Sequence, residues 1–290
     1  MIISLLSHLH EIDVDDMATI EGVALVTVRD IDVYYEVHGR GDRVLSISGT
    51  GGDLRSNPLR GRGLLEQRFE VLMYDQRGLG QTSKPDVPYT MADYADDAVA
   101  LMDALGWERA HVVGTSFGGM VALHVALRHP DRVKKLVLAC TSSGGSGGAS
   151  FDLLAVHDLP TEERLRVTFP ILDSRNDIST DPPTLAPGFD ALLPYLMREQ
   201  PLNAGDPGSA MGARRQLEAR ADHDVWDQLA NIRAETLCIG GRFDRQAPVE
   251  NMERLAAHIP DARLTFCDGG HLFMMQDPTA WPTIINFLAT

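Results

Sequence analysis

The chain has 290 residues, of which 44% are hydrophobic, and a formal net charge of −15 at pH 7 with a pI near 5.0. This length and apolar content suffice for one large domain or two small ones with a buried core. The negative charge opposes binding to nucleic-acid phosphates or anionic lipid, so we expect neither as a partner. No apolar run reaches the roughly 18 to 20 residues that a membrane-spanning helix needs.

The first residues, 1–20, are predicted to be a loosely held appendage. They read MIISLLSHLHEIDVDDMATI, without a basic leader or a small-residue cleavage site, and Met17 is an alternative start. This pattern does not fit a secretory signal, and we expect a cytoplasmic protein.

Short apolar segments then follow along the chain and predict strands. Residues 23–39 alternate apolar and polar side chains on either side of Arg29 and Asp30. This pattern predicts an antiparallel hairpin with one solvent-exposed face. Six later runs are continuously apolar, which is typical of strands covered on both faces; they lie at 44–48, 71–75, 111–115, 135–140, 236–240 and 264–268.

Helical patterns alternate with most of these runs, at residues 89–106, 117–130 and 248–260. Such alternation predicts an α/β fold with a mostly parallel sheet and helices on both of its faces.

Residues 141–233 interrupt this alternation. They contain many prolines and two helix-like pieces, TEERLRVTFPIL and GARRQLEARADHDVWDQL, but no convincing strand. They begin with SSGGSGGAS, a composition typical of flexible connections. We therefore predict a core of residues 21–140 and 234–290, with 141–233 inserted as a helical cap.

The pattern GxSxG, typical of a nucleophilic serine, occurs twice. Ser116 lies between a predicted strand and a predicted helix, and Gly114 and Gly118 permit the sharp turn that this position requires. Ser146 lies in a glycine-rich stretch, with neither a predicted strand before it nor a predicted helix after it. Ser116 is the predicted nucleophile, and Ser146 is the chance match.

A serine nucleophile needs a base and a group that orients the base. Asp244 follows the run at 236–240, and His271 follows the run at 264–268, so both are expected at the carboxyl edge of the sheet with Ser116. The rival acids are Asp268 and Asp277, although Asp268 is close to His271 in sequence. The other nine histidines fall in the appendage, the hairpin, or on strand and helix segments.

Taken together, these motifs resemble the α/β-hydrolase family, whose serine, acid and histidine follow this chain order. The similarity covers about residues 22–290. It includes GTSFG at 114–118, DQRGLGQTS at 75–83, which resembles the family's D-x-R-G-x-G-x-S loop, and Asp244 before Pro248. Some family members carry the acid one strand earlier, but this chain has Thr141, Ser142 and Ser143 there.

The resemblance also implies the positions of supporting groups. The backbone amides of Phe117 and Thr50 would form the oxyanion hole, although Ser48-Gly49 stands where the family usually has His-Gly. In the family's loop at Asp75 and Arg77, such an acid and base are commonly buried for support. A phosphate-binding role for the glycine-rich loop at 48–53 lacks the lysine of a P-loop.

The three cysteines, Cys140, Cys238 and Cys267, lie in or at the end of apolar runs and are expected to be core residues. Their spacing matches no metal-binding pattern, so no metal site is predicted. The serine-based hydrolysis that the resemblance implies requires no organic cofactor either.

The predicted activity is hydrolysis of a small or medium uncharged ester or lactone, with a small molecule as the only expected partner. Oligomeric state is not readable from the sequence. The expected substrate-lining residues are Gly49, Phe117, Met120, Phe189, Tyr195, Met197, Trp226, Phe243 and Leu272. Carbon–carbon bond hydrolases and iminopeptidases use the same triad and remain alternatives. A slow-turnover ligand sensor on this scaffold is a further one.

Overall fold

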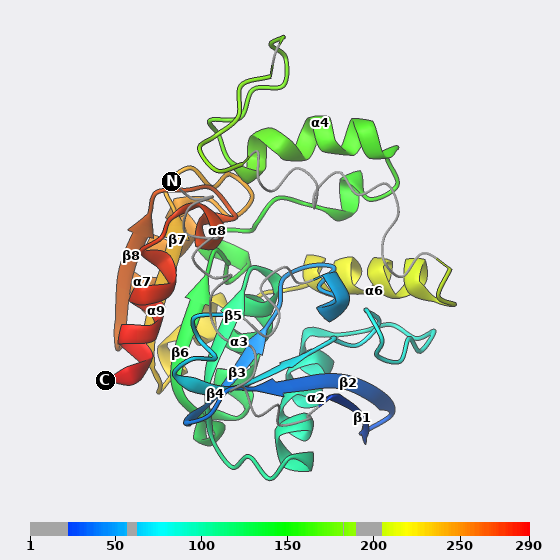
Figure 1. Ribbon diagram of the computed structural model, residues 1–290, viewed down its shortest axis with the longest axis vertical. Helices are drawn as coiled ribbons and strands as arrows, with labels where there is room; N and C mark the ends of the chain where they lie inside the picture. The colour runs from blue at the N-terminus through cyan, green and yellow to red at the C-terminus, as the bar shows by residue number, and fades with distance from the viewer. Residues whose placement is uncertain (1–22, 57–62, 182, 190–204) are drawn as a thin grey trace, which may run out of the picture.

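The computed structural model describes residues 23–56, 63–181, 183–189 and 205–290 and contains an eight-stranded sheet at its centre (Figure 1). The strand order is β1-β2-β4-β3-β5-β6-β7-β8. The strands are β1 Val23–Val28, β2 Ile31–His38, β3 Asp42–Ile47, β4 Phe69–Tyr74, β5 Ala110–Thr115, β6 Val133–Ala139, β7 Glu235–Gly241 and β8 Ala262–Cys267.

The sheet is mostly parallel, as predicted. β1 pairs antiparallel with β2, and β2 antiparallel with β4, so the predicted hairpin forms one edge. The pairs from β4 through β3, β5, β6 and β7 to β8 are all parallel. The carboxyl ends of β3, β5, β7 and β8 therefore meet at one edge of the sheet.

Both faces of the central strands are buried, which explains their continuously apolar sequences. In β5 and β6, Val112 and Leu136 belong to one hydrophobic cluster, whereas Val113 and Val137 belong to another on the opposite face. Because successive side chains of a strand point to opposite faces, only strands covered on both sides require apolar residues throughout.

Helices cover both faces of the sheet. Residues of α2, α3 and α7 join the first cluster, and residues of α8 and α9 join the second. The bounds are α2 Met91–Ala104, α3 Phe117–Arg128, α7 Val249–His258, α8 Phe273–Gln276 and α9 Ala280–Ala289. Among the helices of the described ranges, we find none with the length and apolar character that crossing a bilayer requires.

The predicted insertion, residues 141–233, leaves the sheet after β6 and returns at β7. Within its described part it contains α4 Thr161–Leu172, α6 Ser209–Ala221 and a 3₁₀ helix Trp226–Asn231, and only isolated bridges rather than strands. Figure 1 draws α4 away from the sheet, while the end of α4 accepts backbone hydrogen bonds from Arg245 and His271 in the loops after β7 and β8. The predicted appendage, 1–20, lies outside the described residues.

Candidate active site

Ser116 occupies the sharp turn between β5 and α3. Its φ of 55° and ψ of −116° lie in a region that residues other than glycine rarely adopt. Glycines make the turn possible, because a Cβ on Gly118 would overlap the backbone of Ile47, and one on Gly114 would overlap that of Gly118. Ser146, in contrast, is exposed in a 3₁₀ turn, Gly145–Gly147.

Three side chains from separate loops form a continuous chain of hydrogen bonds at the carboxyl edge of the sheet. Ser116 Oγ lies 2.9 Å from His271 Nε2, and His271 Nδ1 lies 2.8 Å from Asp244 Oδ2. All three are buried, with at most 8% of each residue exposed. Oδ1 of Asp244 accepts backbone N–H groups from Gln246 and Ala247 at 2.8 and 2.9 Å, which fixes the carboxylate.

The rival acids are engaged elsewhere. Asp268 receives a hydrogen bond from Arg175 at 3.0 Å, with the carboxylate largely exposed. Asp277 accepts the backbone N–H of Asp268 and caps the turn at Thr279. Of the candidate acids, Asp244 is therefore the one that the structure brings to His271.

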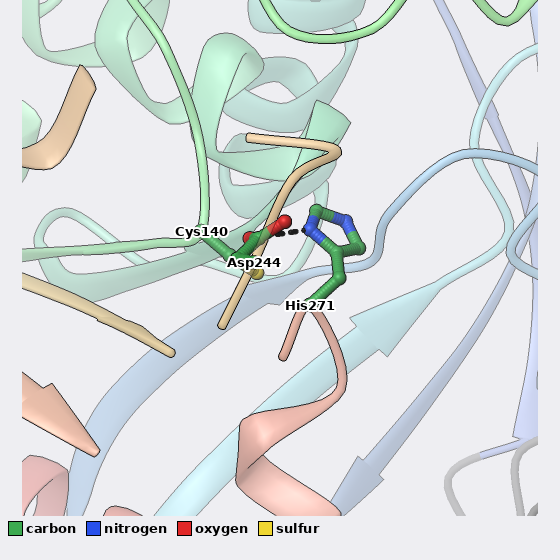
Figure 2. A group of neighbouring side chains, drawn as sticks. All are labelled: Cys140, Asp244 and His271. Carbon is green, nitrogen blue, oxygen red and sulfur yellow. Dashed lines mark hydrogen bonds and ion pairs between the residues drawn. The ribbon is translucent and has the colours of Figure 1, made fainter. Parts of the chain in front are cut away.

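Cys140, at the end of β6, stands behind the Asp244 carboxylate, which points at the His271 ring (Figure 2). One ligand atom from each of the three residues lies within 4.8 Å of the others, which is a spacing that a metal ion tolerates. A metal would require the thiolate, but burial and the charge of Asp244 raise the pKa of the Cys140 thiol well above its usual value. Asp244 and His271 are also hydrogen-bonded to each other, so these side chains suit the Ser116–His271–Asp244 hydrogen-bond chain better than a metal site.

The loop after β3 lies directly beside the nucleophile. A Cβ on Gly49 would be 3.4 Å from Cβ of Ser116. Side chains hold this loop from two directions: Gln76 Nε2 donates to the Ser48 carbonyl at 2.9 Å, and Gly51 N–H donates to Oε1 of Gln216 on α6 at 2.9 Å. Thr50, the expected second oxyanion donor, belongs to this loop.

Phe117 is the first residue of α3, where backbone N–H groups have no partner within the helix. Its ring is fully buried and packs edge-on against Tyr94, with centroids 5.0 Å apart. The ring therefore belongs to the core, and the backbone amide is the part of Phe117 that is relevant to an oxyanion.

The other predicted lining residues occupy different surroundings. Leu272 packs against a small apolar cluster in the insertion that includes Phe189, and Phe243 is half-buried under the Arg175 guanidinium, 4.0 Å from its ring centroid. Met120 is buried in the core on α3. Trp226 packs at a tilt against His258 with centroids 4.0 Å apart, and its described contacts do not include the triad. Tyr195 and Met197 lie outside the described residues.

Gln246 is a further residue of this site, and it was not predicted from the sequence. Its side-chain Nε2 lies 2.7 Å from Nε2 of His271, and the residue is only 6% exposed. The signal that the sequence offered was a polar residue between the predicted acid, Asp244, and Pro248.

Comparison with known proteins agrees with this architecture. The model of the alpha/beta hydrolase fold family matches residues 42–278. "Putative carbamate hydrolase RutD" of Caulobacter sp. strain K31 is 33% identical over 272 residues, covering 89% of this chain and 96% of that protein. The 2-hydroxymuconate semialdehyde hydrolase of Pseudomonas putida is 30% identical over 275 residues, covering 87% of this chain and 88% of that one.

Among solved structures, the enol-lactonase from Burkholderia xenovorans LB400 is similar with a TM-score of 0.75 and 23% identity, covering 92% of this chain and all of that chain. At this identity the likeness concerns the fold. The relatives and the family match extend over most of the chain, and the predicted fold and the predicted family are confirmed. The chain is a hydrolase that belongs to the α/β-hydrolase family.

Proposed function

We propose that this hydrolase is a serine hydrolase that cleaves small or medium uncharged esters or lactones through an acyl-enzyme. The relay from Ser116 Oγ through His271 to Asp244, with steps of 2.9 and 2.8 Å, is the observation that carries the proposal. A hydroxyl is a weak nucleophile near neutral pH, and this arrangement supplies both a base and a group that fixes the tautomer of the base.

In the first half of the reaction, His271 Nε2 takes the Ser116 proton while Oγ attacks the substrate carbonyl. The Asp244 carboxylate, bonded to Nδ1–H, stabilises the imidazolium that results. His271 then returns the proton to the leaving alcohol and leaves an acyl-enzyme. In the second half, His271 takes a proton from water, and the attack of this water releases the acid and restores Ser116.

The developing oxyanion would be held by the backbone amides of Phe117 and Thr50. The first begins α3, and the second lies in the loop whose Gly49 adjoins Ser116. A single donor of this kind contributes about 10²- to 10³-fold to the rate. The support of the loop by Gln76 and Gln216 favours a preformed hole.

The substrate class is inferred from the surroundings of the triad. The apolar cluster of Phe169, Ala186 and Phe189 packs with Leu272, the residue after the proposed base. An apolar surface next to a buried triad favours an uncharged acyl or alcohol group.

Carbon–carbon bond hydrolysis on the same triad is the second candidate, because the 30% identical relative is named a 2-hydroxymuconate semialdehyde hydrolase. Carbamates are also to be tested, because the 33% identical relative is named a putative carbamate hydrolase. A slow-turnover ligand sensor would bind such molecules without rapid release of product.

The test is a panel of p-nitrophenyl esters, lactones, carbamates and vinylogous 1,5-diketo acids, assayed with Ser116→Ala and Ser146→Ala. Ester or lactone turnover is expected to fall by about 10⁴- to 10⁶-fold in Ser116→Ala. Ser146→Ala, which alters the second GxSxG match, is the matched control and should retain full turnover.

Retained hydrolysis in Ser116→Ala would refute the assignment of the nucleophile. A wild-type protein that cleaves only the diketo acids would move the proposal to the second candidate. Rapid labelling of Ser116 by a fluorophosphonate, without turnover of any substrate, would identify a sensor.

A further inference from the structure

The side chain of Gln246 approaches the same atom of His271 that must accept the serine proton. Gln246 Nε2 lies 2.7 Å from His271 Nε2, and Ser116 Oγ lies 2.9 Å from it. His271 Nδ1 is bonded to Asp244, so in the neutral ring it carries the proton and Nε2 is the acceptor. Two donors therefore approach one nitrogen.

A neutral imidazole nitrogen has one lone pair, so the two hydrogen bonds compete. The amide N–H of Gln246 suits the resting ring. It does not suit the imidazolium, because both nitrogens of that ring are donors. When the Ser116 proton moves to Nε2, the amide N–H must leave this position or face another N–H.

The backbone of Gln246 is held on both sides, which limits where its side chain can go. Its N–H donates to Asp244 Oδ1 at 2.8 Å, and its carbonyl accepts from Phe151 N–H at 2.7 Å. With the backbone held, the carboxamide can respond only by rotating about its side-chain bonds. Its N–H then needs another acceptor, because an unpaired buried donor costs free energy.

In the proposed reaction the leaving group stands next to His271 Nε2, because this nitrogen protonates it. The carbonyl oxygen of the substrate instead faces the amides of Phe117 and Thr50. The Gln246 amide, 2.7 Å from Nε2, is thus within reach of the leaving-group side. A hydrogen-bond acceptor there can take over its N–H as the proton reaches Nε2.

We propose that Gln246 is a specificity-determining residue whose amide N–H passes from His271 Nε2 to a hydrogen-bond acceptor in the leaving group. This inference rests on the proposed function and narrows its substrate class. The preferred substrates are esters or lactones that carry an ether, hydroxyl or carbonyl oxygen near the scissile bond on the alcohol side.

The test compares two esters of equal size, 2-ethoxyethyl butyrate and pentyl butyrate. For each protein, the ratio of their kcat/KM values is divided by the ratio of their hydroxide-catalysed rates, which corrects for intrinsic reactivity. The wild-type protein is expected to favour the ether ester by about two- to tenfold, the range of one neutral hydrogen bond.

Gln246→Met keeps the length of the side chain and removes the amide. Its corrected ratio is expected to fall to about one. Gln228→Met, at an exposed position on the 3₁₀ helix Trp226–Asn231, is the matched control and should keep the wild-type ratio. Because a ratio does not depend on the fraction of active protein, partial misfolding of a variant does not obscure the result. Gln246→Leu provides a second variant.

The pH profile separates this role from a merely structural one. In Gln246→Met, the acidic limb of kcat/KM for pentyl butyrate should move to higher pH, because the neutral ring has lost a donor. The inference would be overturned if Gln246→Met kept the wild-type corrected ratio and the wild-type acidic limb of kcat/KM. A corrected ratio of one in the wild-type protein would overturn it as well. The proposed function would still stand in either case if Ser116→Ala abolishes hydrolysis, so the two failures are distinguishable.

Discussion

The backbone of Ser116 is held in an unfavourable conformation by its neighbours. Its N–H donates to the Ala139 carbonyl at 2.8 Å, and its carbonyl accepts from Gly119 N–H at 2.9 Å and from Thr141 Oγ1 at 2.8 Å. A non-glycine residue with such dihedral angles costs about 1 to 3 kcal/mol and persists only where the surroundings impose it. These bonds fix the turn from which Oγ reaches His271.

The bond of the Asp244 carboxylate to His271 Nδ1 predicts a loss of activity when the carboxylate is replaced. Asp244→Asn should lower kcat by about 10⁴-fold, with little loss of stability. Asn can keep the bonds from Gln246 and Ala247 N–H through Oδ1, but its amide would donate to Nδ1 of His271 and force the proton onto Nε2. The measurement is kcat on the best ester together with thermal unfolding.

Asp268→Asn is the matched control, because Asp268 is the rival acid and pairs with Arg175 instead. It should retain nearly all activity. Equal losses in the two variants would contradict the role of Asp244.

At the scale of elements, the loop after β4 connects the hairpin, the sheet and α2. The Arg77 guanidinium, 3% exposed, donates to Asp97 on α2 at 2.7 and 2.8 Å and to Asp30 in the hairpin turn at 2.9 and 2.7 Å. Asp75 accepts the backbone N–H groups of Leu54 and Gln81, and burial raises its pKa to about 6. These contacts are consistent with the supporting role that the family resemblance implied.

Arg77→Met should lower the free energy of unfolding by about 3 to 5 kcal/mol, because it leaves the Asp97 carboxylate buried beside fewer partners. Urea denaturation measures this change. Arg166→Met, which removes an exposed pair with Glu162 on α4, is the control and should change stability by less than about 0.5 kcal/mol. A loss at Arg77 no larger than at Arg166 would show that the buried network contributes little.

At the scale of the whole molecule, two histidines join the insertion to the core. His124 on α3 and His223 after α6 lie 3.2 Å apart (Nε2 to Nδ1), and His223 Nε2 donates to the Ser142 carbonyl at 2.9 Å. Burial lowers the pKa of each histidine to about 4, from an ordinary 6.5. Nearby Arg128 and Arg220 act in the same direction, and Asp224 acts against it.

This contact predicts a loss of stability in mild acid. The unfolded histidines bind protons below about pH 6.5 and the folded ones only near pH 4, so their contribution is complete above 6.5 and declines as the pH falls toward 4. His124→Gln retains an N–H donor but does not titrate, and its free energy of unfolding should depend less steeply on pH in this window. Urea denaturation at pH 7, 5.5 and 4.5 provides the measurement.

His258→Gln, at an exposed position, is the control and should keep the wild-type slope. Asp75, with its raised pKa, acts in the opposite direction but is common to all three proteins and cancels in the comparison. An unchanged slope in His124→Gln would refute the proposed pH dependence.

Much of the fold was predictable because it follows from local patterns. Val112 and Val113 are both apolar since both faces of β5 are covered, and this requirement is visible in the sequence. The helix after Ser116 was likewise evident from its periodicity. The strand ends were less so: β4 begins at Phe69 rather than at residue 71, because pairing with Asp42 of β3 extends it.

The sequence by itself determined the succession of strands and helices along the chain, the turn at Ser116, and which loops carry Asp244 and His271. These properties depend on nearby residues, namely on periodicity, glycine positions and strand ends. Only the tertiary structure decided the contact between Ser116 and His271, which are 155 positions apart, and the approach of Gln246 to the same nitrogen. Such distances depend on how separate loops pack against one another, and no local pattern of residues encodes that packing.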